Sequence, residues 1–247
     1  MRLLLIDNSN TRTKLALSGR GSLLEWRAVI PTPDVSPDSL RAALDHVEWD
    51  ASIISSVVPA KARILVDFLS EKPCHTISHL SNLPIGIDYP KPAQIGADRL
   101  ANAAAAYAMF GGPAIVLDFG TAVTFDVLGL SENAGAVYQG GVIAPGLASM
   151  TEGLARRTAL LPHIELEEPD QAIGKSTEQA MLAGAVYGYR GLVREIINQI
   201  RAELPPEAKI IATGGDATLI TRGLPEINHH CPQLTLEGMR LIANLNI

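Results

Sequence analysis

Leu3-Leu4-Leu5-Ile6-Asp7 has a close match later in the chain, Ala114-Ile115-Val116-Leu117-Asp118, and the pair indicates the architecture. Each is a short apolar run that ends in an aspartate, which is typical of a buried strand entering a polar turn. Small polar residues follow each run, and a second strand-like segment, 13–18 or 122–128, follows each turn. The same order of strand, aspartate, turn with a threonine and return strand therefore occurs twice in one chain.

The segments around these two hairpins read as helices and strands in alternation, which is the pattern of an α/β protein. A long helical pattern covers residues 176–204, with Gly188 and Gly191 as candidate break points. The repeat is too widely spaced for a solenoid, and no low-complexity linker separates its copies. We therefore expect two similar, closely packed lobes with a boundary at Gly111-Gly112-Pro113. The other expected helices are 36–47, 60–69, 97–109 and 234–246, and the other expected strands are 23–30, 51–58, 138–143 and 209–213.

The composition excludes several classes of protein. The chain has 247 residues, of which 47% are hydrophobic, so it can bury a sizeable core. Its formal net charge of −6 argues against nucleic acid as a partner. Cys74 and Cys231 are too few for a disulfide scaffold and lack the spacing of a zinc site. The longest apolar stretch, 100–117, is interrupted by glycine and proline, and we see no secretory signal. We expect a soluble cytoplasmic protein without a membrane partner.

The polar turn after each acid-ended strand has two interpretations. In Asp7-Asn8-Ser9-Asn10-Thr11, small residues allow backbone amides and side chains to approach a phosphate, and Asp7 could hold Mg²⁺ directly or through water. The same segment could be an Asx-type hairpin turn without a ligand. Asp118-Phe119-Gly120-Thr121 offers the same choice. Because the pattern occurs twice, we favour two turns that face each other across a cleft and hold a nucleoside triphosphate with its metal.

Two further segments carry candidate chemistry. Gly96-Ala97-Asp98-Arg99 opens a predicted helix, so Asp98 is either a first-turn acid that stabilises the helix or a general base for a hydroxyl group. In the second case, Arg99 would bind an anionic group of the substrate. Gly214-Gly215 follows a predicted strand and either lets a phosphate or a flat ring approach the backbone or forms a plain strand-to-helix turn.

Several common catalytic motifs are absent from the sequence or fail on spacing. Gly174-Lys175-Ser176-Thr177 is similar to the end of a P-loop, but Pro169 stands where that motif needs glycine, and no apolar strand precedes it. Ser176 or Thr177 is therefore expected to start a helix. The six histidines lack the spacing of a zinc protease, and no Gly-x-Ser-x-Gly elbow is present.

Taken in order along the chain, these segments resemble the type III pantothenate kinases, a family in the superfamily that includes acetate kinase, sugar kinases and actin. The resemblance covers nearly the whole chain, and it rests on the ordered set of motifs because no single motif is decisive. The segments that carry it are Asp7–Thr11, Gly96–Arg99, Asp118–Asp126, Gly140–Gly146 and Leu234–Gly238.

The resemblance implies an α/β fold of two ribonuclease-H-like lobes, the duplicated actin-like ATPase fold, around a nucleotide cleft. Residues 1–112 would form the N-terminal lobe and residues 113–247 the C-terminal lobe, with the final helix, 235–247, free to pack across both. The resemblance also implies a homodimer whose site lies near the subunit interface. The implied activity is ATP-dependent phosphorylation of pantothenate to 4′-phosphopantothenate, the first step of coenzyme A biosynthesis.

The resemblance assigns roles to individual residues as well. Asp98 is expected to be the general base, and Thr177 to reach the substrate across the dimer interface. Asp118 is expected to bind a monovalent cation, K⁺ or NH₄⁺, and Asp7 to bind Mg²⁺ directly or through water. The other pantothenate-binding residues would be Tyr89, Gly96, Ala97 and Arg99. The ATP-binding residues would be Asp7, Asn8, Ser9, Asn10, Thr11, Arg12, Thr13, Lys14, Thr121, Gly214 and Gly215.

One position departs from the family pattern, because Ser9 stands where the family usually has glycine. If that position needs a positive φ, serine is strained there by ~1 kcal/mol or more. If it does not, serine adds a hydroxyl group near the phosphates. Two alternatives therefore stay open beside the kinase. One is a non-catalytic relative that binds nucleotide or pantothenate for regulation, and the other is a kinase of another small acid or sugar, which the fold alone does not exclude.

Overall fold

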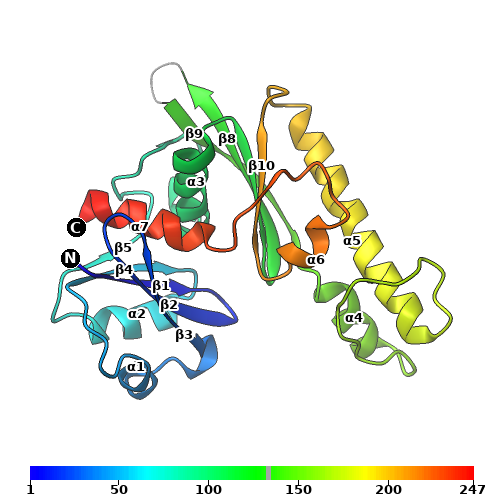
Figure 1. Cartoon of the computed structure of the whole chain (residues 1–247), viewed down its shortest axis with the longest axis horizontal. Helices are drawn as coiled ribbons and strands as arrows, with labels where there is room; N and C mark the ends of the chain where they lie inside the picture. The colour runs from blue at the N-terminus through cyan, green and yellow to red at the C-terminus, as the bar shows by residue number, and fades with distance from the viewer. Residues whose placement is uncertain (132–134) are drawn as a thin grey trace. The chain divides into compact units, whose positions relative to one another are not determined.

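The computed structural model of the chain describes residues 1–131 and 135–247, which form two compact units (Figure 1). The first unit contains Met1–Gly111, Leu130–Gln139 and Gln233–Ile247. The second contains Gly112–Gly129 and Gly140–Pro232. The C-terminal segment therefore belongs to the same unit as the N-terminus.

Five strands form the sheet of the first unit, in the order β3-β2-β1-β4-β5. The central strand β1 is buried along its whole length, as its apolar sequence predicts. It pairs antiparallel with β2, where Asp7 lies opposite Lys14, and parallel with β4, where Asp7 lies opposite Ser55. The bounds are β1 (Leu3–Asn8), β2 (Arg12–Ser18), β3 (Leu23–Pro31), β4 (Ala51–Ser56) and β5 (Cys74–Thr76).

Four helices complete the first unit: α1 (Pro37–Ala43), α2 (Pro59–Phe68), α3 (Ala97–Phe110) and α7 (Leu234–Asn246). Short 3₁₀ turns lie at Thr32–Asp34 and Pro92–Gln94. α1 begins with a capping box between Ser36 and Ser39, and a proline occupies its first turn. Leu40 of α1 and Leu65 of α2 are fully buried in the core beside the side chains of β1 and β2.

Helices α3 and α7 approach each other closely because both carry small residues at their contact. A Cβ atom at Gly238 would lie only 1.8 Å from the carbonyl oxygen of Ala101. Beside this contact, the buried Thr235 hydroxyl donates a hydrogen bond of 2.8 Å to Oδ1 of Asn102. The Leu234–Gly238 segment therefore holds two helices together, which explains its glycine without a ligand.

The second sheet has the strand order β11-β10-β7-β8-β9-β6. In the second unit, its apolar core includes Phe119, Phe125 and Tyr189. The long helix α5, drawn in yellow in Figure 1, continues through Gly188 and Gly191, so the break considered at those glycines does not occur. The bounds are β6 (Gly86–Ile87), β7 (Ala114–Phe119), β8 (Ala122–Ser131), β9 (Gly135–Pro145), β10 (Lys209–Gly214), β11 (His229–His230), α4 (Ser149–Arg157), α5 (Thr177–Arg201) and α6 (Ala217–Thr221).

The same strand arrangement occurs in each unit. β7 pairs antiparallel with β8, where Asp118 lies opposite Thr124, and parallel with β10, where Asp118 lies opposite Thr213. This repeats the arrangement of β1 between β2 and β4, with the aspartate near the end of the central strand in both cases. The α/β class and the duplicated acid-ended hairpin are thereby confirmed. Among the residues that the structure describes, no helix is long and apolar enough to cross a membrane.

Candidate active site

The turn between β1 and β2 presents three predicted ATP-binding residues to solvent. Asn10, Thr11 and Arg12 are exposed, while the Ser9 amide donates a hydrogen bond of 3.2 Å to the Arg12 carbonyl and closes the turn. Thr32, the residue after β3, fixes the turn, because its hydroxyl donates to the Ser9 carbonyl at 2.7 Å and its amide to the Thr11 carbonyl at 3.0 Å. The turn is therefore held in one shape with its outer edge accessible.

Asn8 and Thr13 lie beneath this turn and are fully buried. The Asn8 side-chain amide donates to the Thr13 hydroxyl at 2.7 Å, and the Ser56 hydroxyl donates to Oδ1 of Asn8 at 2.7 Å. The hydroxyl groups of Thr13 and Thr32 lie 3.0 Å apart. These hydrogen bonds give the buried polar atoms partners and fix the base of the turn. Thr32 and Ser56 were not predicted from the sequence, because their role arises only when β3 and β4 are in place.

The Asp7 carboxylate is buried at the foot of the same turn, with 3% of the residue exposed. Its Oδ2 atom lies 3.4 Å from Nζ of Lys14, and its Oδ1 atom accepts a hydrogen bond of 3.2 Å from the Ser9 hydroxyl. Burial raises the pKa of Asp7 above its usual value, while the charge of Lys14 and the hydrogen bonds from Lys14 and Ser9 oppose that rise. Two donors thus hold the carboxylate in one orientation.

Serine is accommodated at position 9 without a left-handed backbone. Among the described non-glycine residues, only His46 has a positive φ, so Ser9 does not. The strain that a positive φ would impose on serine is therefore absent. What the side chain adds is the hydroxyl group that donates to Asp7.

The start of helix α3 lies near the end of β1 in the first unit. The Val57 amide donates a hydrogen bond of 3.1 Å to the Asn8 carbonyl, and a Cβ atom at Gly96 would lie 3.5 Å from Cγ1 of Val57. That Cβ atom would also lie 2.5 Å from Oδ1 of Asp98, so glycine leaves room for the carboxylate at this position. Oδ1 of Asp98 accepts a hydrogen bond of 2.8 Å from the Arg99 amide. The structure thus places Gly96, two residues before Asp98, beside Val57, whose amide is hydrogen-bonded to the last residue of β1.

Two aromatic rings lie next to Arg99. Its guanidinium carbon lies 5.7 Å from the ring centroid of Tyr138, and the rings of Tyr138 and Tyr89 meet edge to face with centroids 6.2 Å apart. Arg99 and Tyr89 are half-buried, whereas Tyr138 is fully buried. Ala97, the remaining predicted pantothenate-binding residue, is buried in the first turn of α3. Tyr138 was not predicted, since it comes from a distant strand and matches no motif.

In the second unit, Gly214 packs directly against the end of β7. Its φ is +96°, and a Cβ atom there would lie 2.5 Å from backbone atoms of Phe119 and 2.6 Å from Oδ1 of Asp118. Gly146 has a similar role, because its Cβ atom would lie 2.4 Å from the carbonyl oxygens of Gly120 and Thr121. Asp118 is half-buried, and both Thr121 and Gly215 are exposed. These two glycines let two other backbone segments pack closely against the Asp118 loop.

Thr177 is the first residue of α5 and is exposed. The preceding residue, Ser176, caps the helix by accepting a hydrogen bond of 3.2 Å from the Gln179 amide, which confirms the expected helix start. Gly174 packs against this first turn, because a Cβ atom there would lie 2.4 Å from the Ala180 amide nitrogen.

The oxygen atoms around Asp7 and Asp118 suit hard cations. Among the residues that the structure describes, His, Cys, Asp and Glu form no group of three or more that could hold a metal ion. A single buried carboxylate is nevertheless the usual protein contribution to a magnesium ion that is otherwise held by nucleotide phosphates and water. Asp7 fits that requirement, and Asp118, beside the converging carbonyl groups of its loop, fits an oxygen-bound monovalent cation.

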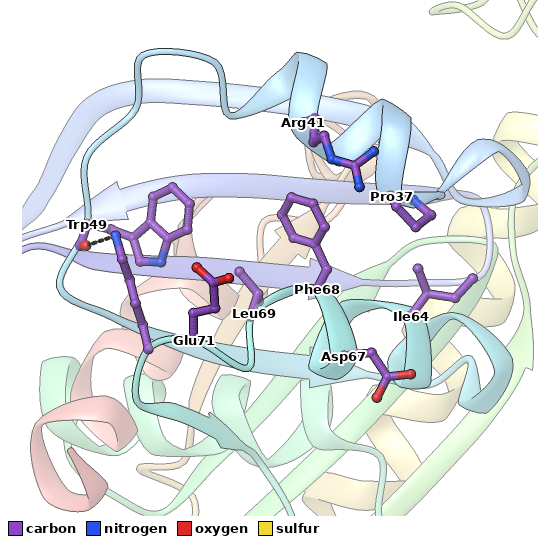
Figure 2. A pocket seen from close by; sticks show the side chains of 9 residues that line it. Pro37, Arg41, Trp49, Ile64, Asp67, Phe68, Leu69 and Glu71 are labelled. Atoms are coloured by element: carbon purple, nitrogen blue, oxygen red, sulfur yellow. Dashed lines mark hydrogen bonds between the residues drawn. The ribbon is translucent and has the colours of Figure 1, made fainter.

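A separate pocket of about 660 Å³ opens beside α1 and α2 in the first unit (Figure 2). Lys72 is engaged there, since its Nζ atom lies 4.1 Å from the ring centroid of Trp49 and donates to the Trp49 carbonyl at 2.7 Å. The two cations in its lining are matched by two carboxylates, so the charges favour no ligand. The pocket is lined by Pro37, Arg41, Trp49, Ile64, Asp67, Phe68, Leu69, Glu71 and Lys72, none of which is a predicted site residue.

Comparison with known proteins agrees with the fold and the motifs. The family model described as type III pantothenate kinase matches residues 3–199. A type III pantothenate kinase from Akkermansia muciniphila is 54% identical over 247 residues, which cover 100% of both proteins.

Two solved structures share the fold at low identity. A Baf family protein from Campylobacter jejuni has a TM-score of 0.62 at 18% identity, covering 98% of this chain and 97% of that one. A glucokinase from an Antarctic psychrotroph has a TM-score of 0.52 at 11% identity, with 98% and 99% coverage. With a family model over most of its length and a relative so similar along all of it, the chain belongs to the type III pantothenate kinase family.

Proposed function

We propose that the chain transfers the γ-phosphoryl group of ATP to the primary hydroxyl group of pantothenate, giving 4′-phosphopantothenate and ADP in the first step of coenzyme A biosynthesis. The observation that carries the proposal is the position of Val57, which is hydrogen-bonded to Asn8 at the end of β1 and lies beside Gly96 at the start of α3. A phosphate-binding turn and a carboxylate at a helix start are the two parts that a hydroxyl kinase must hold together.

Asp98 is the general base in this mechanism. As the pantothenate oxygen attacks the γ-phosphorus, its proton passes to a carboxylate oxygen of Asp98, a new oxygen–phosphorus bond forms, and the bond to the β-phosphate oxygen breaks to release ADP. Gly96 leaves the carboxylate unobstructed, and the Arg99 amide orients its Oδ1 atom. Arg99 pairs with the carboxylate of pantothenate through charge-assisted hydrogen bonds, and Tyr89 and the backbone at Ala97 line the same subsite.

The residues of the β1–β2 turn divide into two groups by burial. The exposed residues Asn10, Thr11 and Arg12 contact the phosphates, while the buried Asn8 and Thr13 fix the base of the turn beneath them. Lys14 contacts Asp7 at 3.4 Å and contacts the phosphates as well, a role that its 48% exposed side chain supports. Ser9 contributes its hydroxyl group to the orientation of Asp7.

Asp7 would hold Mg²⁺ directly or through water, and Asp118 would hold K⁺ or NH₄⁺ at the nucleotide, with Thr121, Gly214 and Gly215 contacting ATP. A bound Mg²⁺ supplies neutralisation of the charge that develops on the transferring phosphoryl group. The working form is a cytoplasmic homodimer in which Thr177 of one subunit completes the pantothenate site of the other. The exposed position of Thr177 at the start of α5 is what supports that role.

The alternatives predict different binding and turnover. The non-catalytic alternative was suggested by Ser9, but serine is unstrained there, so the one feature in its favour is weaker. A kinase for another small acid or sugar remains the second candidate, because related folds accept many substrates.

Release of ADP by the purified protein tests the proposal. ATP, Mg²⁺ and either K⁺ or Na⁺ are supplied with and without pantothenate. We expect release that depends on pantothenate and is faster with K⁺. Binding of ATP or pantothenate without release would favour the non-catalytic relative. Release that starts only with another small acid or sugar would instead identify a different substrate.

A further inference from the structure

Tyr138 lies where two of the proposed pantothenate-binding residues meet. Strand β6 pairs in parallel with β9, which places Ile87 opposite Tyr138, and the Asp88 amide donates a hydrogen bond of 2.9 Å to the Tyr138 carbonyl. This pairing brings Tyr89, just beyond β6, to the ring of Tyr138, where the two planes meet at 72°. The pairing of β6 with β9 therefore places the Tyr138 ring next to Tyr89.

Arg99 is a second partner of the Tyr138 ring. Its guanidinium carbon lies 5.7 Å from the ring centroid, within the range of a cation–π contact. Tyr138 is fully buried and is itself inaccessible to a substrate, whereas Arg99 and Tyr89 are half-buried. Tyr138 is thus a buried, fixed ring that contacts two of the side chains proposed to bind the substrate.

Contact with a buried ring changes what an arginine can do. A long arginine side chain loses much rotational freedom when it binds an anion, and a ring that already restricts it reduces that loss. A guanidinium group that rests on an aromatic face keeps the N–H groups of its edge for a carboxylate, with which it forms two parallel hydrogen bonds. A lysine or an unsupported arginine would recognise the same carboxylate less selectively.

We infer that Tyr138 is a positioning residue that orients Arg99 and thereby selects substrates with a carboxylate at the end remote from the reacting hydroxyl group. The inference rests on the proposed function, since it concerns the pantothenate subsite. It assigns Tyr138 no contact with the substrate and no part in proton transfer.

The test compares pantothenate with pantothenol, in which the carboxyl group is reduced to an alcohol. Tyr138→Leu removes the ring but keeps an apolar side chain, and we expect KM for pantothenate to rise about 2- to 30-fold, the range of one cation–π contact. KM for ATP and kcat should stay near their wild-type values, and the preference for pantothenate over pantothenol should fall by the same factor as pantothenate binding. A purely structural role would alter all of these parameters together.

Two further variants complete the test. Tyr138→Phe removes the hydroxyl group but keeps the ring face, so it should retain the wild-type preference, and a loss of preference in this variant would overturn the inference even if Tyr138→Leu does not fold. Arg99→Met by itself should weaken pantothenate binding and abolish the preference for pantothenate over pantothenol, and adding Tyr138→Leu to it should cause no further loss of preference. Additive losses in the double variant would overturn the inference while leaving the kinase intact. A wild-type protein that phosphorylates neither compound would overturn both the inference and the proposed function.

Discussion

Asp7 shows how a single residue can serve the site at a cost to the fold. Its carboxylate is buried, and burial raises its pKa because the charged form is poorly solvated there. Lys14 and Ser9 each donate to one of its oxygen atoms, which offsets part of that cost. A buried charge with this little compensation is typical of a residue kept for function.

Replacing Asp7 with asparagine should therefore separate stability from activity. Asp7→Asn keeps the size and an acceptor for Ser9 but removes the buried charge, so the free energy of unfolding at pH 7 should rise by up to about 1 kcal/mol. Affinity for Mg²⁺–ATP should fall sharply. Urea unfolding and calorimetric titration measure the two effects, with the exposed Asp170→Asn as the matched control. A less stable variant would show that the charge supports the fold.

The contact between helices α3 and α7 depends on the absence of a single side chain. Gly238→Ala would force a Cβ atom to within 1.8 Å of the Ala101 carbonyl oxygen, so the helices must separate. We expect the free energy of unfolding to fall by about 2 kcal/mol or more in urea denaturation. Gly191→Ala is the control, because that helical position has open space and should gain about 0.5–1 kcal/mol. Equal effects of the two variants would contradict the packing argument.

Glu168 ties the segment before α5 to the helices that follow. It forms a two-armed ion pair with the buried Arg190, whose Nε and Nη2 atoms also donate to the carbonyl groups of Ile220 and Leu219. The hydrogen bonds from Arg190 hold the pKa of Glu168 below its usual value. A carboxylate with a lowered pKa stabilises the fold above pH 4.5, and that stabilisation is lost as the pH falls through the lowered pKa.

Glu168→Gln should therefore be costly only where the carboxylate is charged. At pH 7 the variant should lose about 1–2 kcal/mol of unfolding free energy, since Arg190 stays buried but the Glu168 side chain is 38% exposed and screened. The difference from wild type should disappear in strong acid. Glu152→Gln, which breaks an exposed pair with Arg156, should change stability by less than about 0.5 kcal/mol at any pH. A loss that does not vary with pH would contradict this assignment.

The elements that carry strong patterns could be predicted from the sequence, and those that depend on tertiary pairing could not. The apolar runs of β1 and β7, the alanine-rich α3 and the capped α5 were all predicted close to their observed bounds. β5, β6 and β11 span two or three residues each, which is too short for an alternating hydrophobic pattern to be recognised. The amphipathic helix α4 was also missed. Tyr138 escaped prediction for the same reason as β6, because the pairing of β6 with β9 creates its role.

The homodimer expected for the whole molecule can be tested by measuring the activity of mixed variants. If Thr177 serves the site of the partner subunit, Thr177→Ala and Asp98→Asn should each lose activity, yet a mixture of the two should regain part of it. One site of a mixed dimer would combine an intact Asp98 with an intact Thr177. The two inactive variants are mixed under conditions that allow subunit exchange, and turnover is followed over time. A mixture that stays inactive, although sedimentation shows mixed dimers, would contradict the role across the interface.

The division of the chain at 112/113 and the cleft between lobes stay predictions, whereas the duplicated hairpin is seen in both units. The acid-ended hairpin is a local pattern that can be recognised in the sequence of each unit. The arrangement of two units depends instead on many weak contacts spread along the chain. The residues predicted around Asp7 lie in the first unit and those predicted around Asp118 lie in the second.

The role of Asp98 as general base is tested most directly by single-turnover phosphoryl transfer. The 4′-phosphopantothenate formed from ATP and pantothenate is measured for Asp98→Asn and for wild type. We predict that wild type forms the product, that the variant forms it at least about 10²-fold more slowly, and that both bind ATP equally. Product formation at the wild-type rate by Asp98→Asn would show that Asp98 is not the general base and would contradict the proposed mechanism.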